Sequence, residues 1–197
     1  MTPYYKLKFT AFLFLFIAWH SAISASDRLD NADSTRRKYR SALVFPTPAP
    51  NPKRLFYIQR DPNTNTLMYD INIDKRTGKP DAETPVNAYW VRYAEKGQKE
   101  ELNYIQRKFA YGVTSKAIGN DRYDIRFVSY KKFPLILMKA DDGKYHIFAT
   151  VAQKLIMLSK VFIKIEGGSF WLPNVIFVEM KGTDPVTGKE VTERFKP

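Results

Sequence analysis

Short segments in which apolar and polar residues alternate recur from Arg54 onward, and Pro, Gly, Asn and Asp separate them. Alternation with a period of two is typical of β-strands that bury one face. The pattern predicts strands over residues 54–60, 66–73, 86–93, 121–131, 135–139, 145–151, 161–166 and 175–181, with a last short strand near Val191. The regular spacing predicts a mainly β fold, an antiparallel β barrel or sandwich.

The stretch from Glu100 to Gly112 departs from this alternation. Apolar positions and one glutamine recur there at helical spacing: Leu102, Ile105, Gln106 and Phe109. Acidic residues begin the stretch and basic residues follow, which is the charge order that the helix dipole favours. We therefore expect one amphipathic α-helix, packed over an open end or face of the sheet. A weaker helical pattern covers residues 152–158.

The N-terminal residues 1–25 have the pattern of a signal peptide. Two lysines precede an apolar run of eleven residues from Phe9 to Trp19, and small residues lead up to Ala25. A membrane-spanning helix needs roughly 20 apolar residues, so the run is short for an anchor. We expect cleavage after Ala25, a periplasmic or secreted protein, and no transmembrane anchor after cleavage.

The remaining chain divides into two regions. Residues 26–53 form a polar and proline-rich leader, in which prolines at every second position from 46 to 52 favour an extended strap. Residues 54–197 form a single β-rich domain. The chain has no cysteine, which excludes disulfides, thiol nucleophiles, thiolate metal sites and attachment of lipid to cysteine. A domain of this size without disulfides suits a bacterial periplasm.

The positive charge of the chain bears on its partners. The net charge is +12, and loss of Lys6 and Lys8 with the signal peptide leaves 12 − 2 = +10. Such a charge favours an anionic envelope component or an acidic partner protein. Export and the lack of a recognised motif argue against nucleic acid. Alternatively, the charge is only a solvated surface.

Few residues offer catalytic or metal-binding chemistry. His146 is the one histidine after the signal peptide, and no serine or aspartate motif frames it as a triad requires. Asp61, Asn63 and Asn65 have the first spacing of a calcium loop, but Thr66 and Asn72 stand where an EF-hand needs glycine and glutamate. A hairpin turn is the better interpretation. We expect no metal and no cofactor.

Five carboxylates lie in or beside predicted strands, and a pair facing one cavity could act on a glycan. Their spacing shows no such pair, and cross-strand pairing with arginine or lysine is the commoner role. These residues are Asp70, Asp74, Asp124, Glu166 and Glu179.

The best candidate surface joins the first strand of the domain to the predicted helix, because charged and aromatic side chains occur together there. Its candidate ligand-binding residues are Arg60, Tyr104, Gln106, Arg107 and Tyr111. The same residues could instead only fasten the helix to the sheet.

Several phrases of the sequence together resemble one known family. They are residues 45–46, 52–60 (PKRLFYIQR), 63–65, 88–93 (AYWVRY), 101–112 (ELNYIQRKFAYG) and 167–171 (GGSFW). The chain resembles the domain-of-unknown-function 4833 family of small exported proteins from Bacteroidetes-type bacteria, over residues 45–197. The resemblance implies an exported, single-domain protein and carries no activity or site residue.

These observations predict a non-enzymatic binding or accessory protein of the cell envelope. An envelope hydrolase acting on glycan or lipid, with His146 and a carboxylate as acid and base, is one alternative. A subunit of a larger envelope complex is another. His146 beside a carboxylate in a deep cleft would favour the hydrolase, whereas an interior filled by side chains would contradict it.

Overall fold

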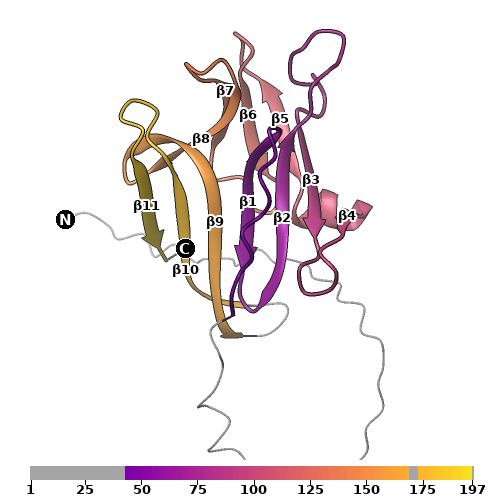
Figure 1. Cartoon of the computed structure of the whole chain (residues 1–197), viewed down its shortest axis with the longest axis vertical. Helices are drawn as coiled ribbons and strands as arrows, with labels where there is room; N and C mark the ends of the chain where they lie inside the picture. Colours follow the sequence, from indigo (N-terminus) through magenta and orange to yellow (C-terminus); the bar gives the residue numbers. More distant parts are fainter. Residues whose placement is uncertain (1–42, 169–172, 197) are drawn as a thin grey trace, which may run out of the picture.

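The computed structural model describes residues 43–168 and 173–196. Within them one sheet has eleven strands (Figure 1). The strands are β1 (Arg54–Arg60), β2 (Asn63–Ile71), β3 (Val86–Val91), β4 (Lys99–Glu101), β5 (Val113–Ala117), β6 (Tyr123–Phe127), β7 (Leu135–Lys139), β8 (Tyr145–Val151), β9 (Lys154–Gly168), β10 (Pro173–Thr183) and β11 (Glu190–Phe195). A short helical segment, η1 (Gln106–Ala110), separates β4 from β5.

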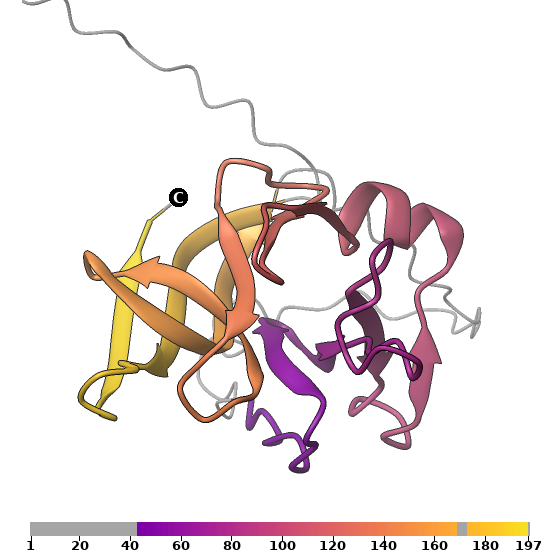
Figure 2. The same ribbon diagram turned by 90° about the horizontal axis from the view of Figure 1, so that it is seen from above.

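The long strand β9 is where the sheet curls. Its first residues, 154–157, pair with β8, and residues 160–163 then pair in parallel with β1 on the same edge. Strand β10 pairs along its other edge and carries β11. Both halves of the sheet therefore begin at the same edge of β9. One half, β1 to β4, pairs with the later part of β9, and the other half, β8 to β5, pairs with its first residues. They form a curled half-barrel (Figure 2).

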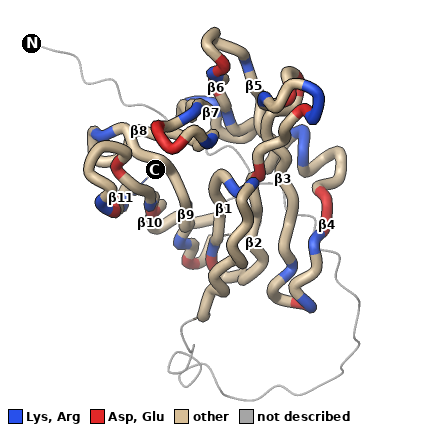
Figure 3. The backbone as a smooth tube through the Cα atoms, turned by 45° about the horizontal axis from the view of Figure 1, so that its top comes forward, with Lys and Arg blue, Asp and Glu red and all other residues tan. Residues whose placement is uncertain are grey.

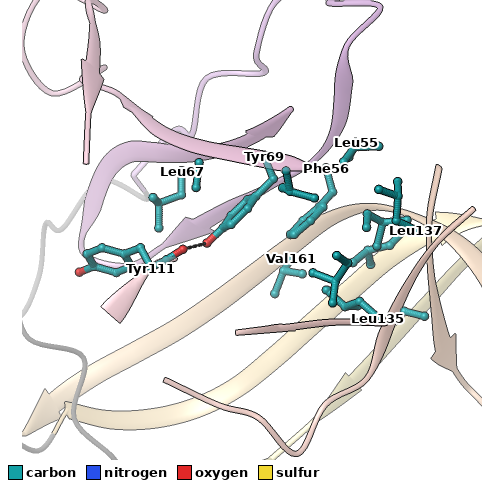
Figure 4. Packing of buried hydrophobic residues seen from close by; sticks show 14 of the residues in the cluster. Leu55, Phe56, Leu67, Tyr69, Tyr111, Leu135, Leu137 and Val161 are labelled. Carbon is teal, nitrogen blue, oxygen red and sulfur yellow. Dashed lines mark hydrogen bonds between the residues drawn. The ribbon is translucent and has the colours of Figure 1, made fainter. Parts of the chain in front are cut away.

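The two halves of the sheet enclose the hydrophobic core. Phe56 of β1 stacks on Tyr69 of β2 at 4.4 Å, and Phe127 of β6 meets both rings edge-on at 6.1 and 5.8 Å. Leu135 and Leu137 of β7 are fully buried and face this aromatic group from the other half (Figure 4). Side chains therefore fill the interior.

The proline-rich strap covers the outer face of β1 and β2. The buried Gln59 side chain donates to the Pro46 carbonyl at 2.7 Å and to the Thr66 hydroxyl at 3.2 Å. Farther along, Asn51 donates to the Asp70 carboxylate at 3.0 Å. Because Thr66 and Asp70 share one face of β2, the strap follows that face from one residue to the other.

The mainly β prediction is confirmed, with a half-barrel as the form of the sheet. The predicted α-helix over 100–112 is not confirmed, since Lys99–Glu101 is a strand and Gln106–Ala110 is a single π-type segment. Of the four positions with helical spacing, Leu102 and Gln106 are buried, whereas Ile105 and Phe109 are exposed. Strand β5 was not predicted.

The helical pattern over residues 152–158 is also contradicted. Ala152 and Gln153 form the tight turn between β8 and β9, with left-handed φ angles of 48° and 62°. The residues after them begin β9. Such a two-residue turn matches the twist of paired strands, so pairing overrides local helix propensity here.

Candidate functional site

Arg60, at the end of β1, lies among aromatic rings. Its guanidinium carbon lies 5.6 Å from the centre of the Trp90 ring and 5.9 Å from that of Tyr111. The two rings meet edge-on at 5.0 Å. A second cation, Arg92, lies 5.1 Å from the Trp90 ring. Cation–π contacts of Arg60 thus link β1 to Trp90 of β3 and to Tyr111, the residue that follows η1.

Burial and neighbouring charges set the electrostatics of this cluster. The pKa of Arg60 is lowered to about 10, mainly by burial; Tyr111 opposes this change and the positive charge of Arg92 contributes to it. Burial raises the pKa of the Tyr111 phenol, against the effect of the two arginines. Arg92 also donates to both oxygens of Glu100 at 2.7 and 2.6 Å. That hydrogen bond lowers the pKa of Glu100.

The inner side of the η1 segment is held by hydrogen bonds. Asn103 and Gln106 bond reciprocally, since each backbone N–H donates to the other's side-chain oxygen, at 2.9 and 3.1 Å. The Ser129 hydroxyl donates to the Ala110 carbonyl at 2.7 Å. The buried Tyr69 hydroxyl donates to the Tyr111 carbonyl at 2.9 Å (Figure 4).

Gly112 is required where η1 meets β5. A Cβ atom at this position would lie 1.9 Å from the Arg107 carbonyl oxygen, much closer than atoms can approach. The wide π-type turn places that carbonyl against the backbone of residue 112. Glycine therefore allows the chain to leave η1 directly into β5.

The five predicted site residues divide between two sides of this segment. Arg60 and Tyr111 meet in the cation–aromatic cluster, and Gln106 is buried one turn before Tyr111. Tyr104 is exposed and contacts Lys108, whereas Arg107 pairs with Glu101 at 3.5 Å. The residues that sequence reasoning missed are Trp90 and Arg92, although their predicted strand already mixed aromatic and basic side chains.

A pocket of about 270 Å³ lies where the two halves of the sheet meet opposite β9. We call this place the seam. It is bounded by β3 and the loop before it, by the start of β5, and by η1. Its lining residues are Asn72, Glu83, Thr84, Pro85, Val86, Asn87, Ala88, Arg107, Gly112, Val113 and Ser115.

One wall of the seam is the outer edge of β5. Ile118 N–H donates to Arg122, and Val128 N–H donates to the Gly112 carbonyl, so residues 112 and 118 face β6. Backbone groups alternate between the two edges of a strand. Val113, Ser115 and Ala117 therefore direct their N–H and C=O groups toward the seam. Within the described ranges, β5 pairs with β6 alone.

The opposite wall is β3, which β4 covers only in part. Pairing between the two strands extends from Val91 to Tyr89 and ends there. In the described part of the chain, Val86 to Ala88 therefore have no partner strand on that edge. One side-chain bond bridges the walls, because the Ser115 hydroxyl donates to the Glu83 carbonyl at 3.1 Å.

His146 lies on β8, away from the seam pocket. Its Nε2 is 2.9 Å from the Asp142 carboxylate, in the β7–β8 hairpin, and both side chains are partly exposed. Backbone N–H of Lys144 and the His146 side chain lower the pKa of Asp142. The pair lies on the outer face of the hairpin, since Ile147 and Ala149 point into the core.

The candidate carboxylates pair with cations. The shortest contacts join Asp70 to Arg54, Asp124 to Arg126, Glu179 to Arg194, Glu166 to Lys164 and Asp74 to Arg76. The Glu179–Arg194 pair is cross-strand, between β10 and β11. Each of these five carboxylates therefore contacts a cation, and these contacts do not join any two of the five as a catalytic pair.

The calcium-like spacing belongs to the β1–β2 hairpin. Asn63 accepts from the Asn65 backbone at 2.7 Å, Asn65 accepts from Ala94 at 2.9 Å, and Asp61 pairs with Lys164. Among the residues described, no group of three or more His, Asp or Glu could hold a metal ion. No helix within the same residues is long and apolar enough to span a membrane.

Comparison with known proteins identifies a family. No curated protein and no solved structure matches the chain. A family model described as a domain of unknown function, DUF4833, matches residues 56–194, from β1 to β11. The protein therefore belongs to the DUF4833 family.

Proposed function

We propose that this protein is a non-enzymatic binding protein of the cell envelope, and that it receives an extended peptide segment of a partner at the seam. The observation that carries the proposal is the outward edge of β5, which borders a pocket. An extended peptide can add to such an edge through main-chain hydrogen bonds. Accessory proteins and subunits of envelope complexes both need a site of this kind.

The lining of the seam suits a peptide with small apolar side chains. Pro85, Val86 and Val113 supply apolar surface, while Ser115 and Arg107 supply polar groups. Main-chain bonds give affinity in β-strand addition, and side-chain pockets on alternate positions give specificity. The seam has both elements.

A hydrolase is supported less well. Of the described residues that line the pocket, Glu83 is the one carboxylate and none is a histidine. His146 meets Asp142 on the outer side of the β7–β8 hairpin, and neither residue is among those that line the seam pocket. The interior that could have held a substrate is filled by packed side chains.

A peptide library tests the proposed site. Random-sequence peptides displayed on phage are selected on the chain from Ser26 onward, and enriched peptides are titrated against variants. Ala117→Pro removes one N–H that faces the seam, and proline is tolerated on edge strands. We expect about tenfold weaker binding, as for a lost main-chain hydrogen bond with added steric conflict.

Thr192→Pro is the matched control. It removes an outward N–H from β11, a second edge strand whose residues 191 and 193 face β10. Binding should be unchanged in this variant. No enrichment of peptides, or equal affinity of Ala117→Pro and the native chain, would refute the proposed site. Thermal unfolding of each variant verifies that it folds.

Export is the second part of the proposal. The support is the sequence of residues 1–25, with its basic start, apolar run and small residues before Ala25. Mass spectrometry of the N-terminal peptide from an envelope extract should find Ser26 as the first residue. A mature chain that begins at Met1 or Thr2 would contradict it.

A further inference from the structure

The outer side of η1 exposes large apolar side chains. Tyr104 is 70% exposed, Phe109 53% and Ile105 42%. These three residues occupy less than two turns of chain. Exposed apolar residues scattered singly are ordinary, whereas several gathered at one place mark an interaction surface.

This exposure is fixed by the packing beneath it. Gln106 and Ala110 are buried on the inner side of the segment, and Asn103 and Ser129 bond to them. Turning Ile105 or Phe109 inward would break those bonds. The apolar side chains are therefore held outward by the fold.

A lysine lies along the exposed rings. Lys108 Nζ is 2.8 Å from the Tyr104 hydroxyl, 5.2 Å from the centre of its ring and 5.5 Å from that of Phe109. The aliphatic stem of a lysine can cover apolar surface while its ammonium group reaches a polar layer. Aromatic rings beside such a cation suit the boundary between water and lipid.

A loop bonded to η1 also exposes an aromatic side chain and two lysines. Ser129, bonded to Ala110, is followed by Tyr130, which is 42% exposed, and by the exposed Lys131 and Lys132. We call Tyr104, Ile105, Lys108, Phe109 and Tyr130 the η1 surface. Exposed apolar side chains and positive charge therefore occur together on and near η1.

We propose that the η1 surface docks on an anionic lipid bilayer, with Ile105 and Phe109 entering the headgroup boundary and Lys108 meeting lipid phosphates. Lys131 and Lys132, in the loop bonded to η1, add charge, and the chain from Ser26 onward carries 12 − 2 = +10. Figure 3 shows Lys and Arg on several strands and loops, with Asp and Glu among them. Basic residues near an anionic surface contribute additively to binding, and inserted apolar side chains add to it.

A bilayer fits this surface better than an acidic protein partner. Its apolar residues project from the outer side of η1 and are not among those lining the seam pocket, which lies beside Gly112. A flat, deformable lipid surface can accept isolated projecting side chains. The proposal is independent of the peptide site at the seam.

Vesicle sedimentation tests the proposal with the chain from Ser26 onward. The probes are vesicles of phosphatidylcholine alone and vesicles with equal parts of phosphatidylcholine and phosphatidylglycerol. We expect about tenfold stronger partitioning to the anionic vesicles, and a decrease as salt rises. The double variant Ile105→Ser/Phe109→Ser should lose about tenfold in partitioning to them.

Matched controls separate insertion from general charge. Ile118→Ser changes an isoleucine of the same 42% exposure, at the other end of β5, and should bind as the native chain does. Lys108→Glu should weaken binding more than Lys189→Glu, which lies in the exposed β10–β11 turn.

Three outcomes would overturn the proposal. The first is no preference for anionic vesicles. The second is equal partitioning of the Ile105/Phe109 variant and the native chain, which would leave charge alone as the cause. The third is equal loss in Lys108→Glu and Lys189→Glu. Unfolding curves that match the native chain verify that each variant is folded.

Discussion

Strands β2 and β10 differ in how many layers cover them. Residues 65–71 of β2 are all buried, on both faces of the strand. In β10 only Met180 and Gly182 are buried, and the others are partly or fully exposed. Leu67, Tyr69 and Ile71 share one face of β2, and Thr66, Met68 and Asp70 share the other. The strap bonds to Gln59 and Asp70 on this second face, and a second layer there accounts for its burial.

The largest expected effect comes from the middle of the covered face. Met68 is almost completely buried, so Met68→Ala should lower the free energy of unfolding by about 3 kcal/mol through lost contacts and a cavity. Ile176→Ala, on the open strand β10, should cost less than about 1 kcal/mol. Urea unfolding measures both. Equal losses of unfolding free energy in the two variants would mean that β2 is no better covered than β10.

The strap itself provides the next test. Pro48 is buried and Pro50 is exposed, two residues apart in the same extended segment. Pro48→Asp would place a charge against the sheet and should cost about 2 kcal/mol. Pro50→Asp should change stability by less than about 0.5 kcal/mol. If thermal unfolding gave both variants the same midpoint, the strap would not be a packed layer.

A smaller effect is expected from side-chain hydrogen bonds to backbone carbonyls. Gln59→Leu removes the donor to the partly buried Pro46 carbonyl and to the Thr66 hydroxyl, and should cost about 1 kcal/mol. Its counterpart is Asn174, whose side chain donates to the exposed Glu166 carbonyl of β9 at 3.0 Å. Asn174→Leu should be nearly neutral, because water replaces the lost donor. Guanidinium unfolding with a common slope would compare the two.

The smallest effect belongs to the open side. Arg194→Ala breaks the cross-strand pair with Glu179, and the exposed arginine should contribute less than about 0.5 kcal/mol. Added salt should remove even that difference, because it screens exposed charges. A loss of several kcal/mol would show that β10 and β11 are covered in solution. Differential scanning calorimetry at low and high salt makes the measurement.

The fold was predictable where local patterns and pairing agree. Strands β1, β7 and β8 alternate between turn residues, and the extended strap follows from its prolines. Strand β5 (VTSKA) is polar because it forms an edge, so its sequence carries no apolar alternation. Likewise, Ile105 and Phe109 have helical spacing but face outward, because the buried positions of η1 are Gln106 and Ala110.

The candidate site was less predictable because it depends on tertiary arrangement. Arg60 meets Tyr111 only after the two halves of the sheet close on each other. The seam depends on where pairing between β3 and β4 ends, which no residue pattern marks. Sequence could identify aromatic and basic side chains near η1, but it could not tell which face each one takes.

The parallel pairing of β1 with β9 also determines the order of assembly. Near this pairing, Asp61 contacts Lys164, 103 residues later in the chain. A chain that emerges N-terminus first can form the β1–β2 hairpin early, but one edge of β1 stays open until Ile163 follows. Long-range pairing of this kind slows folding, and open edges invite aggregation. The sheet can therefore close on β1 only after β9 has been synthesised.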